Sequence, residues 1–192
     1  VLDENEYDFI MVNEIIGAAA ILGSESLYRE FRERVAGRFY YEPGQKTNRF
    51  HEGFLRGILG EIGSVLAAPK STYSINPKEE GLRPIKGLLS ALKLVHGVEK
   101  VNAWEILDEL KMKDRWRKEQ YDSIERTLSF FELFRHLYQI LVAQDEEILI
   151  REKPIEEMVT KLARMIGYED SGVLSAEDFM VVNYYQYLEG AI

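Results

Sequence analysis

The sequence feature that constrains the fold most is a long helical pattern at residues 115–145, which contains neither glycine nor proline. At about 100° per residue, its apolar side chains form a stripe along one side of the helix. Leu133, Leu137 and Ile140 lie on the opposite side, so the helix is apolar over most of its circumference. We therefore predict a long central helix with other helices packed around it. The stripe contains Ile124, Leu128, Phe131, Tyr138 and Val142.

Shorter segments with helical periodicity occupy most of the remaining chain, and glycines and prolines fall between them. Ser175 with Asp178 has the spacing of a helix-capping box, and Gly97 and Gly167 fit the ends of helices. No Asn-Gly or Asp-Gly pair indicates a β-hairpin. The sequence therefore predicts an all-α fold, a helical bundle around one long central helix. Helices are expected near 5–21, 25–38, 47–67, 84–96, 102–112, 115–145, 154–166 and 175–189, with irregular connections at 39–46 and 68–83.

The charge of the chain disfavours one class of partner. A net charge of −9 argues against nonspecific binding to nucleic acid, because such binding needs a basic surface. Residues 1–100 carry 13 Lys and Arg against 14 Asp and Glu, whereas residues 101–192 carry 11 against 19. Since the acidic second half repels phosphate, we expect any phosphate-binding site in the first half.

The chain contains no cysteine, which excludes disulfides and thiolate metal sites and allows a location in the cytoplasm. The longest apolar run, from Ile15 to Gly23, is far too short for a membrane-spanning helix. No secretory signal is visible. We therefore expect a cytoplasmic protein that binds neither membrane nor nucleic acid.

The candidate binding segment runs from Asn76 to Arg83, ahead of an apolar helix. Its two cations, Lys78 and Arg83, lie on either side of Gly81. A glycine lets the backbone approach a ligand closely, and the N-terminus of the following helix carries a partial positive charge. We therefore expect Lys78, Gly81 and Arg83 to bind a substrate or an anion in a cleft that faces a partner domain. The alternative is that the two cations only tether the segment to neighbouring carboxylates.

Arg135 is a further candidate, because it falls in the middle of the apolar stripe of the long helix. An isolated charge inside a bundle is too costly, so the guanidinium must be paired. One interpretation is a buried structural ion pair with Glu79, Glu80 or Glu132. The other is that Arg135 binds an anion in a cleft beside the long helix.

Motifs for catalysis and for metal binding are absent from the sequence. It contains no Walker loop, no GxGxxG motif and no recognisable catalytic triad. Glu132 and His136 have the spacing to share a metal, but an ordinary helical pair explains them better, since the chain has only three histidines. We therefore predict neither catalytic residues nor a metal site in this chain.

Residues 76–98, NPKEEGLRPIKGLLSALKLVHGV, resemble a segment of the form Leu-Lys-x-x-Gly-x-x-Pro-Ile that precedes a helix. That segment marks the nucleotidyltransferase substrate-binding domain of bacterial signalling proteins. The same residues are similar to the Lys-Glu-Gly-Pro-Gly-Gly-Leu-Arg-Asp-Ile motif of PII-protein uridylyltransferases and glutamine synthetase adenylyltransferases.

Two later blocks resemble the helical domain of the same enzymes. Phe131 to Gln144 resembles its Leu-Arg-x-x-His-x-Leu-x-Leu stretch. Leu162 to Tyr187 resembles a uridylyltransferase pattern of Leu-Ala-x-x-Leu-Gly-Tyr-x-Asp, Phe-Met and paired tyrosines. The three blocks keep the family's order and cover Ser71 to Leu188. The resemblance implies a nucleotidyltransferase-associated helical domain at 71–192, preceded by N-terminal helices at 1–70 that are a linker or part of the bundle.

The chain also departs from the family motif. Lys78 and Arg83 match the family's Lys and Arg, but Gly81 stands alone in place of Gly-Pro-Gly-Gly. Pro84 replaces the Asp, so any role of that Asp is absent. The nucleotidyltransferase signature, Gly-Ser followed by Asp-x-Asp on a strand, is missing as well. Two-metal nucleotidyl transfer needs such clustered carboxylates, so the chain alone is not expected to catalyse it.

The resemblance therefore implies a helical substrate-binding or regulatory domain of a signalling nucleotidyltransferase, without its catalytic domain. That catalytic domain would lie upstream on the same polypeptide or in a partner. It would bind Mg²⁺ and a nucleoside triphosphate, and this chain would bind no cofactor. A regulatory protein is the expected substrate.

The alternative is a stand-alone helical module for protein–protein interaction. A Gly-Ser and Asp-x-Asp strand pair encoded upstream of Val1 would support the transferase domain, and an initiator Met directly before Val1 would support the module. A ferritin-type metal enzyme would need paired Glu-x-x-His motifs, which the sequence lacks.

Overall fold

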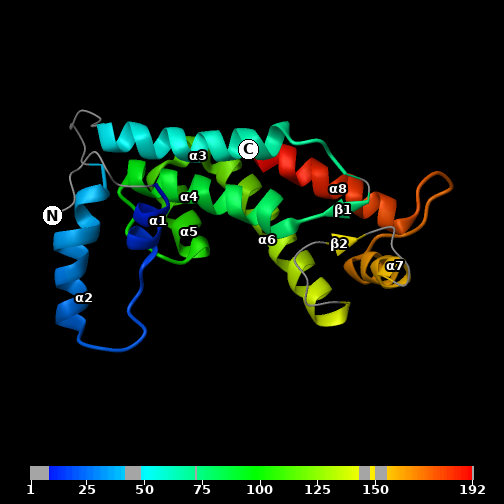
Figure 1. Cartoon of the computed structure of the whole chain (residues 1–192), viewed down its shortest axis with the longest axis horizontal. Coiled ribbons are helices and arrows are strands. Elements are labelled where there is room, and N and C mark those ends of the chain that lie inside the picture. Colours follow the sequence, from blue (N-terminus) through cyan, green and yellow to red (C-terminus); the bar gives the residue numbers. More distant parts are fainter. Residues whose placement is uncertain (1–8, 42–48, 72, 143–147, 150–154, 192) are drawn as a thin grey trace. The chain divides into compact units, whose positions relative to one another are not determined.

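The computed structural model describes residues 9–41, 49–71, 73–142, 148–149 and 155–191. Helices make up most of this part (Figure 1), so the predicted all-α fold is confirmed. The α-helices are α1 (Phe9–Gly17), α2 (Glu25–Phe31), α3 (Arg49–Ala67), α4 (Arg83–His96), α5 (Ala103–Lys113), α6 (Lys118–Leu141), α7 (Ile155–Ile166) and α8 (Ala176–Ala191). Shorter elements are the π-helical turns η1 (Arg32–Ala36) and η3 (Pro77–Leu82), the 3₁₀ turns η2 (Gly37–Phe39) and η4 (Arg115–Arg117), and the strands β1 (Ser74–Ile75) and β2 (Ile148–Leu149).

Several expected helix ends are confirmed by their hydrogen bonds and backbone angles. Ser175 precedes α8, and its hydroxyl donates to Asp178 Oδ2 (2.8 Å) and accepts from the Asp178 N–H (3.3 Å). Gly97 and Gly167 follow α4 and α7 with φ of 59° and 108°, a backbone conformation that glycine adopts at little cost. The expected helix residues 5–8, 47–48, 143–145 and 154 lie outside the described residues.

The strands β1 and β2 were not expected from the sequence. They pair antiparallel, with Ser74 opposite Leu149 and Ile75 opposite Ile148. The side chains of Ile75 and Ile148 are buried. Strands of two residues are too short to show the alternating pattern by which a strand is recognised in a sequence.

The chain forms two compact units. Unit 1 comprises Val1–Gly63 and Lys86–Tyr121, and unit 2 comprises Ser64–Ile85 and Asp122–Ile192. The predicted division after residue 70 differs from these bounds, because residues 86–121 group with the N-terminal segment. The boundaries fall inside α3, α4 and α6, where no linker composition marks them.

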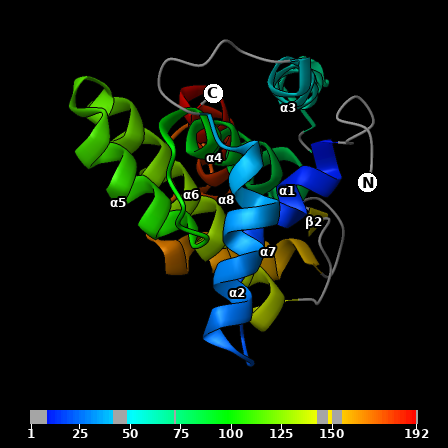
Figure 2. The same ribbon diagram turned by 90° about the vertical axis from the view of Figure 1, so that its left-hand side faces the viewer.

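Unit 1 has an apolar core formed by α1, α3, α4 and the residues around η2. Figures 1 and 2 both show α1 beside α4 in this unit. Burial of these side chains is the main source of stability for such a small core. The core contains Val12, Ile16, Phe39, Tyr40, Phe54, Ile58, Ile62, Ala91 and Leu94.

Unit 2 has an aromatic core between α6 and α8. The ring of Phe131 lies 5.0 Å from that of Tyr184, with the planes at 86°, and Phe130 stacks on Tyr187 at 4.4 Å. Residues 167–175 connect α7 to α8, and these two helices pack together (Figure 1). Tyr184 and Tyr187 therefore pack α8 against α6.

α6 buries one face and leaves part of the other in solvent. Leu133 and Ile140, on the face opposite the predicted stripe, are 52% and 77% exposed. The expectation that neighbouring helices cover both faces is wrong for these two side chains. An apolar spacing shows which side of a helix can be buried, and whether a neighbour reaches that side depends on the tertiary fold.

Candidate functional site

The candidate segment is helical from its first residues, which corrects the expected irregular connection. η3 begins at Pro77 and continues directly into α4. Asn76 Oδ1 accepts a hydrogen bond from the Glu79 N–H (3.1 Å), and the Asn76 N–H donates to Glu80 Oε2 (3.0 Å). Asparagine at the N-cap and proline at the first position are strong start signals, so the helix starts at Pro77 instead of Pro84.

Glu80 connects this helix start to α8. The buried hydroxyl of Tyr184 donates to Glu80 Oε2, the oxygen that also accepts from the Asn76 N–H. Burial, and after it the charge of Glu80, raises the pKa of Tyr184, so the hydroxyl stays protonated and remains a donor. A carboxylate that accepts two hydrogen bonds is firmly oriented, so Glu80 fixes the start of the helix against α8.

Tyr185 anchors the chain just before β1. Its hydroxyl donates to the Ser71 carbonyl (2.7 Å) and accepts from the Ser71 N–H (2.8 Å). Lys70 forms an ion pair with Glu189 beside it. The two adjacent tyrosines of α8 thus hold the segment on both sides of β1.

Gly81 packs against the aromatic core of unit 2. A Cβ atom at this position would lie 2.6 Å from Cδ1 of Phe131, far inside van der Waals contact. Both residues are buried. This packing by itself explains why residue 81 is glycine, and the expected approach of a ligand to Gly81 stays a prediction.

Lys78 and Arg83 have exposed side chains. Arg83 Nη1 lies 2.9 Å from Glu79 Oε2, one helical turn away. Exposed pairs of this kind contribute only a few tenths of a kcal/mol, roughly 0.3–0.5. Arg83 therefore makes the tethering contact that the alternative interpretation expects, but the contact is weak.

Arg135 is half-buried in α6 instead of lying at the centre of the buried face. Thr127, Phe130 and Phe134 are buried as well, so the buried face is centred on their side of the predicted stripe and Arg135 lies at its edge. Glu80, one of the three carboxylates expected as its partner, accepts a hydrogen bond from Tyr184. Arg135 does interact with other groups of the protein, and its role in anion binding stays a prediction.

The GlnD PII-uridylyltransferase family model matches residues 78–189, more than half of the chain. The chain belongs to this family. The comparison with curated proteins and the comparison with solved structures each give no match. The family match begins at Lys78 and ends at Glu189, so it includes both candidate cations and the paired tyrosines that anchor their segment. The resemblance carried by the three sequence blocks is thereby confirmed.

Two properties of the described residues bear on cofactors and location. No three His, Asp or Glu side chains among them come together as metal ligands. Of the helices that the structure describes, none is long and apolar enough to cross a membrane.

Unit 1 contains a polar cluster that the sequence did not reveal, made of Arg32, Tyr40, Lys93 and Glu99. Arg32 Nη2 donates to Tyr40 Oη (3.3 Å), to the Glu99 carbonyl (3.1 Å) and to Glu99 Oε2 (3.3 Å). The guanidinium carbon lies 5.5 Å from the centre of the Tyr40 ring. We name this group the Arg32–Lys93 cluster.

Lys93 is the most deeply buried charged side chain of this cluster, with 2% of its surface exposed. Its Nζ donates to the Ile16 carbonyl (2.7 Å) and lies 6.0 Å from the centre of the Tyr40 ring. Burial, followed by the charge of Arg32, lowers the pKa of Lys93 to about 8. A lysine among apolar residues of α4 is the one sequence signal that could have pointed to this cluster.

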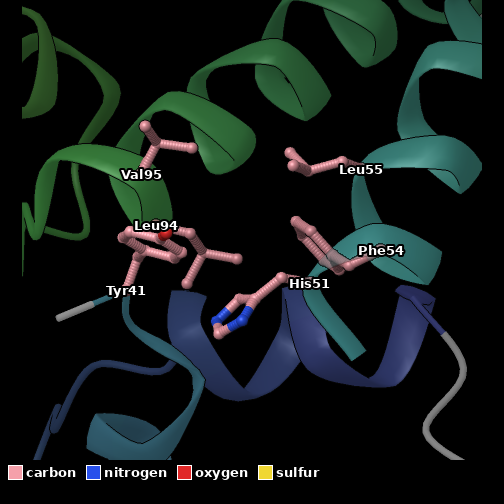
Figure 3. A pocket seen from close by; sticks show the side chains of 6 residues that line it. All are labelled: Tyr41, His51, Phe54, Leu55, Leu94 and Val95. Carbon is pink, nitrogen blue, oxygen red and sulfur yellow. The ribbon is translucent and has the colours of Figure 1, made fainter. Parts of the chain in front are cut away.

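Unit 1 also contains an apolar pocket of about 270 Å³ lined by Tyr41 and by side chains of α3 and α4 (Figure 3). The His51 ring stands edge-on to Tyr41, with 5.5 Å between ring centres, and its Nε2 lies 3.0 Å from the Phe39 carbonyl oxygen. Among the residues that the structure describes, no carboxylate, lysine or arginine lines the pocket, so these residues offer mainly shape and apolar contact. The described residues that line it are Tyr41, His51, Phe54, Leu55, Leu94 and Val95.

Proposed function

We propose that this chain is the helical substrate-binding or regulatory domain of a signalling nucleotidyltransferase of the PII-uridylyltransferase type. A catalytic domain, on the same polypeptide or in a partner, would perform the transfer and bind Mg²⁺ and the nucleoside triphosphate. The substrate would be a regulatory protein, and the reaction would take place in the cytoplasm. The observation that carries the proposal is the family match that begins at Lys78.

The contacts around η3 support a binding role for this surface. Glu80 and Gly81 make the inward contacts of the turn, to Tyr184 and Phe131, whereas Lys78 and Arg83 remain exposed. Cations held on an anchored helical turn lose little freedom on binding, which favours affinity. The exposed Arg83–Glu79 pair is weak, so an incoming acidic group can replace Glu79 at small cost.

The contribution of this chain would be to bind and orient. Lys78 and Arg83 would contact an acidic surface of the regulatory protein or of the catalytic domain, and Arg135 would add a third cation. Charges at such a rim mainly raise the association rate and select the partner. Bond making would belong to the catalytic domain, where carboxylates hold the metal.

The first test uses the purified chain alone. With Mg²⁺ and labelled nucleoside triphosphates we expect no transfer to any protein, because the sequence lacks the carboxylate signature. The second test uses the complete protein, or the chain combined with its catalytic domain. We expect the double variant Lys78→Ala/Arg83→Ala to lose transferase activity while keeping the wild-type melting temperature.

A matched control is Arg126→Ala/Lys161→Ala, which removes two exposed cations from α6 and α7. This control should keep full activity. If Lys78→Ala/Arg83→Ala lowers the melting temperature, and activity falls only with the folded fraction, the segment is scaffold and the proposed site is wrong. Metal-dependent labelling by the purified chain alone would contradict the assignment of catalysis to another domain.

One observation favours the second candidate, a stand-alone module for protein–protein interaction. Leu133 and Ile140 both expose apolar surface on α6, and a larger exposed apolar patch would mark a site where another protein binds. The reading frame upstream of the Val1 codon separates the candidates. A Gly-Ser and Asp-x-Asp signature there supports the transferase domain, and an initiator codon directly before Val1 supports the module.

A further inference from the structure

The Arg32–Lys93 cluster holds more buried positive than negative charge. The Arg32 side chain is 12% exposed and Lys93 is 2% exposed, so both cations have lost most of their hydration. Glu99 is the single carboxylate bound to either of them among the described contacts. Buried cations are costly unless an anion accompanies them, so a cluster with two cations and one carboxylate is incomplete.

Hydrogen-bond donors are also in excess in this cluster. Arg32 Nη1 is buried and has no hydrogen-bond partner within the part of the chain that the structure describes. Lys93 Nζ donates to the Ile16 carbonyl alone among the described contacts, although an ammonium group has three donors. A buried donor without an acceptor destabilises the fold, and an oxyanion with several acceptor oxygens would relieve that cost.

Glu99 shows how an anion can reach the cluster. Its side chain is 76% exposed, whereas its carboxylate oxygen lies 3.3 Å from Arg32 Nη2. A carboxylate that is mostly in water pays little to leave the guanidinium and return to solvent. The position of the Glu99 carboxylate on Arg32 is therefore open to exchange from the solvent side.

We propose that the Arg32–Lys93 cluster is a binding site for a small oxyanion of the phosphate class, which takes the position of the Glu99 carboxylate on Arg32. The anion accepts hydrogen bonds from both terminal nitrogens of Arg32, and the Lys93 charge adds long-range attraction. The Tyr40 hydroxyl, already bonded to Arg32, stands beside the anion. This site lies in unit 1 and is independent of the function proposed for Lys78 and Arg83.

The test measures anion binding by the whole chain. Inorganic phosphate is titrated at constant ionic strength, with sodium chloride as the replacement salt, and binding is followed by calorimetry and by the melting temperature. We expect saturable binding of phosphate and a rise in melting temperature that chloride does not produce. A parallel titration with a nucleoside monophosphate assigns the site to a nucleotide if it binds more tightly, and to free phosphate if it does not.

Variants of the cluster give opposite expected effects. Arg32→Met should weaken phosphate binding by roughly tenfold or more, because it removes both charge-assisted hydrogen bonds that Arg32 donates to the anion. Glu99→Gln should instead tighten binding several-fold, because it removes the competing carboxylate and keeps the side-chain shape. Arg34→Met is the matched control, since Arg34 is an exposed arginine of the same helical turn, and it should bind phosphate like the wild type.

The proposal is overturned if neither the wild type nor Glu99→Gln shows saturable binding, or if chloride and phosphate act equally. The proposal is also overturned if Glu99→Gln lowers the melting temperature without binding phosphate more tightly. Glu99 would then be a purely structural partner of Arg32. Because Glu99→Gln keeps both cations, it tests the site even if Arg32→Met does not fold.

Discussion

The two units bury charges of opposite sign. In unit 2 the carboxylate of Glu80 is directed inward, where Tyr184 and the Asn76 N–H bind it, and the cations Lys78 and Arg83 are exposed. In unit 1 the cations Arg32 and Lys93 are directed inward, and the carboxylate of Glu99 is exposed.

This contrast teaches that a family motif and a buried charge give different kinds of evidence. The charges of the 76–83 segment belong to the motif, but each inward-facing group there has a satisfied structural contact. The Arg32–Lys93 cluster belongs to no motif, and its buried Arg32 Nη1 has no acceptor among the described residues. Satisfied polar groups stabilise a fold, whereas buried groups with unmet hydrogen-bonding capacity indicate a ligand or a cost in stability.

The largest effect is expected from Tyr184→Phe, which removes the hydroxyl that Glu80 binds. The carboxylate would lose its buried donor, and the free energy of unfolding should fall by about 2–3 kcal/mol. Urea denaturation measures this change, and Tyr187→Phe is the control, since its ring also packs in unit 2. An equal loss in both variants would show that the Glu80 contact adds nothing beyond ring packing.

A smaller loss is expected from Gly81→Ala. The added methyl group would collide with the Phe131 ring, and overpacking of this kind costs about 1–3 kcal/mol, less the gain in helix propensity. Gly53→Ala in α3 is the control, because nothing lies within 4 Å of a Cβ at that position. If Gly81→Ala is as stable as the wild type, the glycine is free for the ligand approach that the sequence suggested.

Lys93 should give the fold a pH dependence opposite to that of a paired lysine. Its pKa in the folded protein, about 8, is below the ordinary value of 10.5. Between these values the unfolded chain holds more protons, so the free energy of unfolding should rise with pH, by at most about 1.4 kcal/mol per pH unit. Arg32 keeps its charge and Tyr40 its proton over most of this window, because the pKa values of both are raised.

Chemical denaturation at pH 7.5 and pH 10 measures this dependence against Lys93→Met. The variant should be more stable than the wild type at pH 7.5, and the difference should shrink at pH 10. Lys100→Met, which changes an exposed lysine, should follow the wild type. A Lys93→Met protein that is less stable at both pH values would show that the ammonium group is well compensated in unit 1.

The smallest effect is expected from Arg83→Ala. Its pair with Glu79 is exposed and spans one helical turn, so its removal should cost no more than about 0.5 kcal/mol and should vanish in high salt. A loss above about 2 kcal/mol would make Arg83 a structural residue and would erase the contrast between the two units.

The helices were predictable because their signals are local. The apolar spacing of α6, the Ser175 cap and the glycines after α4 and α7 all act within a few residues. The start at Pro77 also has a local signal, Asn76 at the N-cap and Pro77 at the first helical position, although an irregular connection was expected at 68–83. The β1–β2 pair and the boundaries inside α3, α4 and α6 depend on contacts between distant residues, which one sequence does not reveal.

The candidate site was only partly predictable for a similar reason. The motif identified Lys78 and Arg83, which the structure places in solvent, but it could not show that Gly81 lies against Phe131 or that Glu80 binds Tyr184. Arg135 was predicted at the centre of the buried face of α6 because the predicted stripe left out Thr127, Phe130 and Phe134, which are also buried. Arg32 and Lys93 are far apart in the sequence, and only the fold brings both to the Tyr40 ring.

The discontinuity of the two units has a consequence for synthesis on the ribosome. Residues 64–85 belong to unit 2, but their partners in α6 and α8 are translated much later. Until α8 emerges, Glu80 lacks the Tyr184 hydroxyl and Ser71 lacks Tyr185. Closing such a long loop is slow and exposes apolar surface in the meantime. A chain that stops before α8 should therefore depend on chaperones, with its 64–85 segment accessible to proteases.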